Sequence, residues 1–200
     1  VSAAWLTYVY VGYPLIAWLL AKVAGKTVDR SSAYCPSVSV LTAAHNEAAH
    51  IGATVQNKLE LDYPPGKLEL IVISDGSVDG TDEIVKAFGE RVTLLRQEPR
   101  AGKTSALNMA VQRARGEILV FSDANSIYDR GALREIVANF ADPAVGYVTG
   151  KMVYTNPDGS LVGDGCSAYM RYENFLRSAE SGFGSVIGVD GGIDAVRRSL

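Results

Sequence analysis

The first 21 residues, Val1 to Ala21, carry no charged side chain and are mostly apolar. A helix of this length is about 30 Å long, which matches the hydrocarbon core of a bilayer. Aromatic residues near its ends are typical of the membrane interface. The segment therefore predicts one transmembrane helix over residues 1–21. A buried core helix is an alternative, and a secretory signal peptide would need a basic start and a small-residue cleavage site, which we do not find.

Residues 22–36 are polar and form a predicted connector. Three basic residues follow the apolar segment, namely Lys22, Lys26 and Arg30. Because basic residues beside a membrane helix stay on the inner side, we expect residues 22 onward on the cytoplasmic face of the cell membrane. In that reducing compartment the two cysteines, Cys35 and Cys166, are expected to be unpaired.

From residue 38 short apolar runs alternate with stretches whose apolar residues recur at helical spacing. The predicted strands are 38–42, 68–74, 92–95, 117–122 and 145–153. The predicted helices are 47–61, 81–88, 105–114 and 131–140, and Asn46 is the expected cap of the first. Strands that alternate with single helices pair in parallel through right-handed crossovers. The order predicts an open, mostly parallel α/β sheet with helices on both faces.

After residue 153 the sequence predicts a helix over 167–179 and a glycine-rich segment over 182–192. The chain stops at Leu200 without a helix terminator, so we expect it to be part of a longer protein. Residues 37–200 are predicted to form one domain that is incomplete at its C-terminal end. Two hundred residues suffice for one domain plus an appendage, and the formal net charge of −3 argues against a nucleic-acid partner.

Polar residues collect where the predicted strands end, the edge at which open α/β sheets bind ligands. They are Asn46 and Glu47 after the first strand, Asp75 after the second, Lys103 after the third, and Asp123 and Asn125 after the fourth. Carboxylates at adjacent strand ends, with a lysine nearby, suit a divalent cation that bridges a diphosphate. The set predicts a nucleotide-binding edge.

Other interpretations of these residues stay open. Gly102 and Lys103 resemble a phosphate-binding P-loop, but Gln97 stands where that motif needs its first glycine. Each residue also has a purely structural interpretation. Asp75 would be a turn residue, Asp123 a helix cap, and Lys103 a solvated surface charge.

Four motifs, in this order, resemble those of family 2 glycosyltransferases. They are Val38–Leu41 with Asn46 and Glu47, Ile73–Ser77 with Asp79–Thr81, Gly102 and Lys103 with Ala106–Asn108, and Phe121–Asn125. The resemblance covers residues 37 to about 198 and is greatest to the membrane-bound polysaccharide synthase branch. It implies the glycosyltransferase A-type fold, a nucleotide-sugar donor that is usually a UDP-sugar, a Mg or Mn ion, and inversion at the anomeric carbon.

The resemblance also implies roles for single residues in donor binding. Ala43, Asn46 and Glu47 would line the nucleotide pocket. Asp75 would hydrogen-bond the uracil or the ribose, and Lys103 would meet the diphosphate.

Asp123 and Asn125 occupy the Asp-x-Asp position, at which the resemblance implies a ribose or metal contact by the first residue and a metal ligand in the second. Asn125 departs from the family because its amide oxygen offers no charge, which weakens the expected metal site. Four residues resemble the segment that shapes the acceptor site, namely Gly188, Asp190, Gly191 and Gly192. The general base of the family is an Asp that we expect beyond Leu200.

Together these features predict an inverting glycosyltransferase of the hexosyl or N-acetylhexosaminyl type. It would move a sugar from its donor to a polysaccharide, lipid-linked or other saccharide acceptor at the cytoplasmic membrane face. A nucleotide-sugar-binding module without catalysis is the alternative suggested by Asn125 and the missing base. A P-loop nucleotidase is the third hypothesis.

Overall fold

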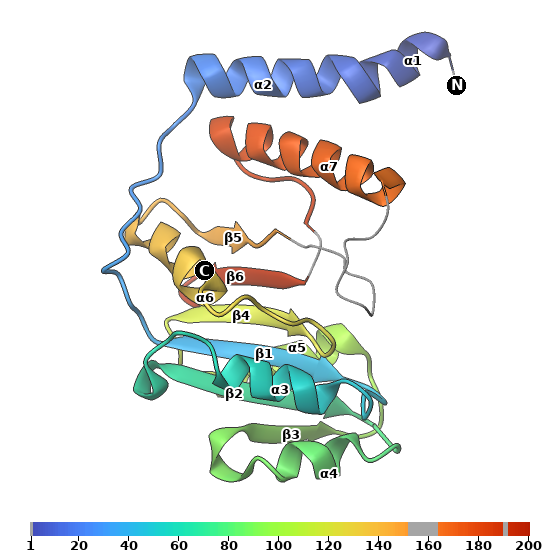
Figure 1. Cartoon of the computed structure of the whole chain (residues 1–200), viewed down its shortest axis with the longest axis vertical. Helices are drawn as coiled ribbons and strands as arrows, with labels where there is room; N and C mark the ends of the chain where they lie inside the picture. Colours follow the sequence, from blue (N-terminus) through green and yellow to red (C-terminus); the bar gives the residue numbers. More distant parts are fainter. Residues whose placement is uncertain (1, 152–163, 190–191) are drawn as a thin grey trace. The chain divides into compact units, whose positions relative to one another are not determined.

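The computed structural model describes residues 2–151, 164–189 and 192–200, with the side chains of the last helix described from Ala168 onward. The chain divides into two compact units (Figure 1). One consists of Val1–Val28 with Lys151–Asp190, and the other of Asp29–Gly150 with Gly191–Leu200. The predicted domain limits of 1–21, 22–36 and 37–200 stay a prediction.

The apolar N-terminal segment is helical in the first unit. It consists of α1 (Ala3–Thr7), a π-helical turn (Tyr8–Gly12) and α2 (Tyr13–Ala24). The turn lies directly before the first residues of α2, where Pro14 has no N–H to donate. The helical segment Ala3–Ala24 has 22 residues, contains an 18-residue stretch with a mean hydropathy of 1.4, and is long and apolar enough to cross a membrane. This agrees with the predicted apolar helix.

Helix α7 (Asp164–Phe183) packs along α2 within the same unit. The Tyr13 hydroxyl donates a hydrogen bond of 2.8 Å to Oε1 of the buried Glu180, and the Lys26 N–H donates to the Gly182 carbonyl. The predicted helix 167–179 is thus confirmed and is longer at both ends. The side chain of Cys166 lies outside the described residues, and Cys35 is a free thiol.

A six-stranded sheet, in the order β3-β2-β1-β4-β6-β5, forms the centre of the second unit (Figure 1). The strands are β1 (Val38–Ala44), β2 (Leu68–Asp75), β3 (Thr93–Gln97), β4 (Ile118–Asp123), β5 (Tyr147–Thr149) and β6 (Ile193–Arg197). Strands β1 to β4 pair in parallel, as predicted, whereas β6 runs antiparallel to both of its neighbours. The fold is therefore the predicted open, mostly parallel α/β sheet.

Helices cover both faces of this sheet because successive strand residues point to opposite sides. Val38 and Val40 of β1 join the apolar cluster that contains residues of α3 (Ile51–Leu59), α4 (Thr81–Lys86) and α6 (Ala132–Val137). Leu41 joins the cluster on the other face, which is covered by α5 (Lys103–Arg113). Buried aliphatic side chains make up most of both clusters, so the strands between them are held rigidly.

The sequence does not predict β6, and the helix over 47–61 begins later than expected, at Ile51. Ile193–Arg197 directly follows a glycine-rich segment, and its pairing with β4 joins residues far apart in sequence. The predicted strand over 145–153 is observed only at Tyr147–Thr149, and its last two positions lie outside the described residues.

The Arg197 side chain connects β6 to the segment before β5 by hydrogen bonds. Its Nε donates to the Val145 carbonyl (2.8 Å), and its Nη2 donates to the carbonyls of Phe140 (2.6 Å) and Asp142 (2.7 Å). We expect Arg197→Met to lower the free energy of unfolding by about 2–3 kcal/mol, because carbonyls that accepted charged donors lose them. The side chain of the exposed neighbour Arg198 donates no hydrogen bond to a carbonyl among the described residues, so Arg198→Met should change the free energy of unfolding by less than about 0.5 kcal/mol. Urea unfolding in detergent checks both values, and equal effects of the two substitutions would contradict this role.

Candidate functional site

The register of the parallel strands brings the predicted polar residues to one edge of the sheet. Asp75 of β2 stands opposite Gln97 of β3, and Ala43 of β1 stands opposite Asp123 of β4. The chain moves outward from β1 through β2 to β3 and then crosses back to β4 on the other side of β1. Such a reversal opens a crevice at the carboxyl ends of the strands, where open α/β sheets hold their ligands.

Asp75 has a buried carboxylate, and its side chain is 4% exposed. Oδ1 accepts hydrogen bonds from the Gln97 amide (2.6 Å) and the Ala101 N–H (2.9 Å), and Oδ2 accepts one from the Gly102 N–H (2.8 Å). Burial alone would raise the pKa of this carboxyl, but the hydrogen bonds and the Arg100 guanidinium hold it below the ordinary value. Asp75 thereby fixes the loop between β3 and α5, a role that differs from that of a simple turn residue.

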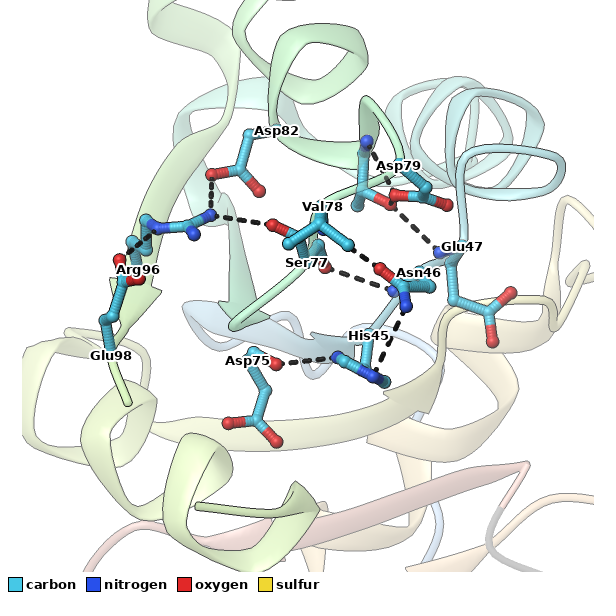
Figure 2. A network of polar contacts seen from close by, with 11 residues as sticks. His45, Asn46, Glu47, Asp75, Ser77, Val78, Asp79, Asp82, Arg96 and Glu98 are labelled. Carbon is cyan, nitrogen blue, oxygen red and sulfur yellow. Dashed lines mark hydrogen bonds and ion pairs between the residues drawn. The ribbon is translucent and has the colours of Figure 1, made fainter. Parts of the chain in front are cut away.

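The loop after β1 is bonded to the loop after β2 (Figure 2). The Asn46 N–H donates to Ser77 Oγ (3.1 Å), and Asn46 Oδ1 accepts from the Val78 N–H (3.0 Å). The Glu47 N–H donates to Thr81 Oγ1 (2.9 Å). These bonds hold the backbone of the predicted nucleotide-lining segment in one conformation.

Asn46 is not the helix cap that the sequence predicts. The residue before α3 is His50, and Asn46 lies in the left-handed region with φ 54°. Asparagine tolerates this conformation better than most residues, and its side chain is used by the neighbouring loop instead. The prediction was wrong because an asparagine before a helical pattern also fits a left-handed turn.

His45 joins the same network, although none of the four sequence motifs includes it. Its Nδ1 lies 2.8 Å from the Asp75 carbonyl oxygen, so the ring connects the ends of β1 and β2 (Figure 2). Because that carbonyl only accepts, Nδ1 carries the proton in this contact. The ring is partly exposed at the edge.

Arg96 supports the loop after β2 from the β3 side (Figure 2). Its guanidinium donates to the Ser77 carbonyl (3.2 Å) and pairs with Asp82 (2.7 Å) and Glu98 (2.9 Å). Asp79 closes the loop by accepting from the Ala48 N–H (2.9 Å). Periodicity does not reveal these contacts, because they join polar side chains across two loops.

Lys103 and Asp123 form an ion pair at this edge, with side-chain exposures of 57% and 32%. Lys103 is the first of the 11 residues of α5. The residue before it, Gly102, has a positive φ of 92°. Free N–H groups at such a helix start favour anions. The two residues predicted to meet the diphosphate and the cation are therefore adjacent.

Asn125 is exposed two residues beyond β4. The described residues contain no group of three or more His, Cys, Asp or Glu side chains that could hold a metal ion by itself. Asp123 and Asn125 offer one carboxylate and one amide oxygen. This donor set fits Mg²⁺ or Mn²⁺ where phosphate oxygens and water complete the coordination, which is how such ions are commonly bound beside nucleotides.

The predicted acceptor segment is described only in part. Gly188 belongs to the first unit and Gly192 to the second, whereas Asp190 and Gly191 lie outside the described residues. The Gly192 carbonyl accepts a hydrogen bond of 3.2 Å from the Tyr128 hydroxyl, so it is connected to the loop that follows β4.

An open, mostly parallel sheet with this polar edge at its reversal point is the arrangement that ligand-binding α/β proteins use. The family model for glycosyl transferase family 2 matches residues 39–197, and the chain belongs to this family. Membership confirms the resemblance seen in the four sequence motifs.

Relatives and solved structures agree with this assignment. A beta-monoglucosyldiacylglycerol synthase of Nostoc sp. is 30% identical over 168 residues, which are 82% of this chain and 36% of that protein. A poly-beta-1,6-N-acetyl-D-glucosamine synthase of Staphylococcus aureus is 35% identical over 128 residues, 62% of this chain and 30% of that protein. The mannosyltransferase PcManGT from Pyrobaculum calidifontis, solved with GDP-Man and Mn²⁺, has a TM-score of 0.78 at 33% identity over 98% of this chain and 55% of its own.

The fold is thus of the glycosyltransferase A type. The chain spans 30% and 36% of the length of the two synthases and 55% of the solved mannosyltransferase. The roles of Ala43, Asn46, Glu47, Asp75, Lys103, Asp123 and Asn125 stay predictions.

Proposed function

We propose that this chain binds a nucleoside-diphosphate sugar at the carboxyl edge of β1–β4 and supplies the donor site of an inverting glycosyltransferase. The observation that carries the proposal is the pairing of Lys103 with Asp123 at the strand reversal, beside the ordered loops after β1 and β2. A cationic group, a helix start and a carboxylate meet there, and a diphosphate with its cation needs these groups.

Two nucleotide bases, uracil and guanine, are candidates for the donor. The sequence resemblance favours a UDP-sugar. PcManGT, which is 33% identical, is described in complex with GDP-Man, and this makes a guanine nucleotide the second candidate. His45 and the backbone of Asn46 and Glu47 would face the nucleoside, because they belong to the loop after β1.

The chain's own residues would act on the leaving group. Lys103 would turn from Asp123 to a phosphate oxygen, and the N–H groups at the start of α5 would stabilise the negative charge that develops as the sugar departs. A divalent cation held by Asp123 and Asn125 would supply further positive charge to the diphosphate. Asp75 would keep the β3–α5 loop, and with it Lys103, in position.

The acceptor is proposed to be a lipid or a saccharide at a membrane. The relatives include a synthase of monoglucosyldiacylglycerol and one of a polysaccharide, and Ala3–Ala24 is long and apolar enough to cross a bilayer. The basic residues after this helix favour a cytoplasmic location for the sheet.

The test is binding and transfer of a labelled donor by the chain in native membranes. Membranes that contain it are incubated with Mn²⁺ and UDP-glucose, UDP-N-acetylglucosamine or GDP-mannose, each labelled in the sugar. We expect the membranes to bind one labelled donor above the level of membranes with Lys103→Ala, and label found in the lipid or the polysaccharide fraction would identify the acceptor. Binding of a donor without transfer would instead support the nucleotide-sugar-binding module without catalysis.

A further inference from the structure

A buried lysine contacts the segment that carries the predicted cation ligands. No role is predicted for this residue from the sequence. Lys58 is on α3 and is 2% exposed. None of the ion pairs among the described residues involves its ammonium group. Nζ donates to the Ser126 carbonyl, lies 3.4 Å from Asn57 Oδ1 and stands 3.5 Å from the centre of the Tyr128 ring.

Such a side chain is unfavourable for the stability of the fold. Burial lowers the pKa of Lys58 to about 7, which reflects the cost of removing an ammonium group from water. Methionine would fill a similar volume without that cost. A lysine at this position is therefore better explained by the contacts that its head group makes.

Two neighbours on the same face of α3 contact the same segment. Thr54 Oγ1, which is buried, donates to the Ala124 carbonyl (2.7 Å). Asn57 makes a pair of bonds with the Tyr128 backbone, donating to its carbonyl (2.9 Å) and accepting from its N–H (2.8 Å). Residues three and four positions apart share one helix face, so Thr54, Asn57 and Lys58 together form a polar clamp on residues 124–128.

The clamped segment carries the predicted cation ligands. Asp123 precedes it at the end of β4, and Asn125 lies within it. Ala124 and Tyr128 are buried, whereas Asn125 is exposed. The clamp thus holds alternate parts of the segment against α3 and leaves the ligand side chains at the edge.

We propose that Thr54, Asn57 and Lys58 are positioning residues that set the segment 123–128 for cation and donor binding. This inference rests on the proposed function of the same edge. The clamp would act through the backbone carbonyls of Ala124 and Ser126, since outer contacts of this kind orient metal ligands. Tyr128 would extend the effect of the clamp to Gly192, because the Tyr128 hydroxyl donates a hydrogen bond to the Gly192 carbonyl.

The test compares Lys58→Met with Lys67→Met. Lys67 also donates from Nζ to a backbone carbonyl, that of Cys35, but it precedes β2 at the opposite end of the strand from Asp75. Both variants and the wild type are titrated with Mn²⁺ at saturating UDP or GDP, whichever binds the wild type, and then with that nucleotide without metal. We expect Lys58→Met to lower the apparent Mn²⁺ affinity about 10- to 100-fold, with metal-free nucleotide affinity changed less than about threefold. Lys67→Met should leave both unchanged.

A second pair of variants covers the case in which Lys58→Met does not fold. Thr54→Ser keeps the hydroxyl donor, and Thr54→Val removes it at similar size. Thr54→Val should lower the apparent Mn²⁺ affinity, and Thr54→Ser should retain it.

Amide hydrogen exchange of residues 123–128 tests the clamp without any ligand. We expect faster exchange in Lys58→Met and Thr54→Val and no change in Lys67→Met. If the wild type binds Mn²⁺ with nucleotide and the clamp variants bind it equally well, the positioning role is refuted while the proposed function stands. If the wild type shows no such binding, the proposed function fails and the positioning role fails with it, whatever the exchange data show of the clamp.

Discussion

Replacing Asp123 by alanine is expected to abolish the Mn²⁺-dependent part of nucleotide binding. Asp123 supplies the one carboxylate among the two predicted cation ligands, and its side chain is 32% exposed at the edge. Loss of this ligand should cost at least about 100-fold in apparent Mn²⁺ affinity, since even outer contacts to a metal ligand are worth about 10- to 100-fold. Calorimetric titration with nucleotide, with and without Mn²⁺, measures the effect.

Asn125→Asp is the matched variant for this experiment. It adds the second charge that the family's Asp-x-Asp position usually has, so we expect tighter Mn²⁺ binding in the presence of nucleotide. An Asp123→Ala protein with unchanged Mn²⁺ dependence would show that the cation is held elsewhere.

Replacing Asp75 by alanine is expected to affect both stability and nucleotide binding. Three hydrogen bonds to a buried carboxylate are lost, and the N–H groups of Ala101 and Gly102 lose their acceptor. We expect the free energy of unfolding to fall by about 3 kcal/mol. Without metal, Asp75→Ala should weaken nucleotide binding more than Asp123→Asn does, because the loop that carries Lys103 is no longer held. Equal losses of metal-free nucleotide affinity in the two variants would contradict the proposal that Asp75 positions the loop that carries Lys103.

The pH dependence of stability gives a second readout for Asp75. Its pKa is lower in the folded chain than the unfolded value of about 3.9, so its stabilising effect is present above that value and is lost as the pH falls through the folded pKa. Asp75→Asn lacks this titration. The difference in unfolding free energy between the wild type and Asp75→Asn should therefore shrink between pH 6 and pH 3, as measured by urea unfolding. A constant difference would contradict the ionised carboxylate.

Periodicity predicted the parallel part of the fold well because β1 and most of β2 are buried on both faces. Val38 to Leu41 and Leu70 to Ile73 are apolar at every position except Ser39, and such runs are distinctive. β6 was missed because Ile193–Arg197 mixes apolar and charged residues and depends on distant pairing with β4. Its position in the sheet is a tertiary effect that local pattern does not encode.

The site was predicted at the level of strand ends and not at the level of contacts. Asp75, Lys103 and Asp123 follow from the rule that ligands bind at the carboxyl edge of the sheet. The partners of Asp75 were not foreseen, because Gln97 and the Ala101 and Gly102 amides reach it through loop geometry. The same holds for Lys58, since an analysis of apolar spacing on α3 selects Ile51 and Val55 and treats a lysine as solvated.

The central claim is that the carboxyl edge of β1–β4 binds a nucleoside diphosphate together with a divalent cation. Its most direct test is calorimetric titration of the detergent-solubilised chain with UDP and with GDP, each with and without Mn²⁺, and with ATP as the control. We predict Mn²⁺-dependent binding of UDP or GDP and little response to ATP. A preference for ATP, or no binding of UDP or GDP by a chain shown to be folded, would contradict the claim.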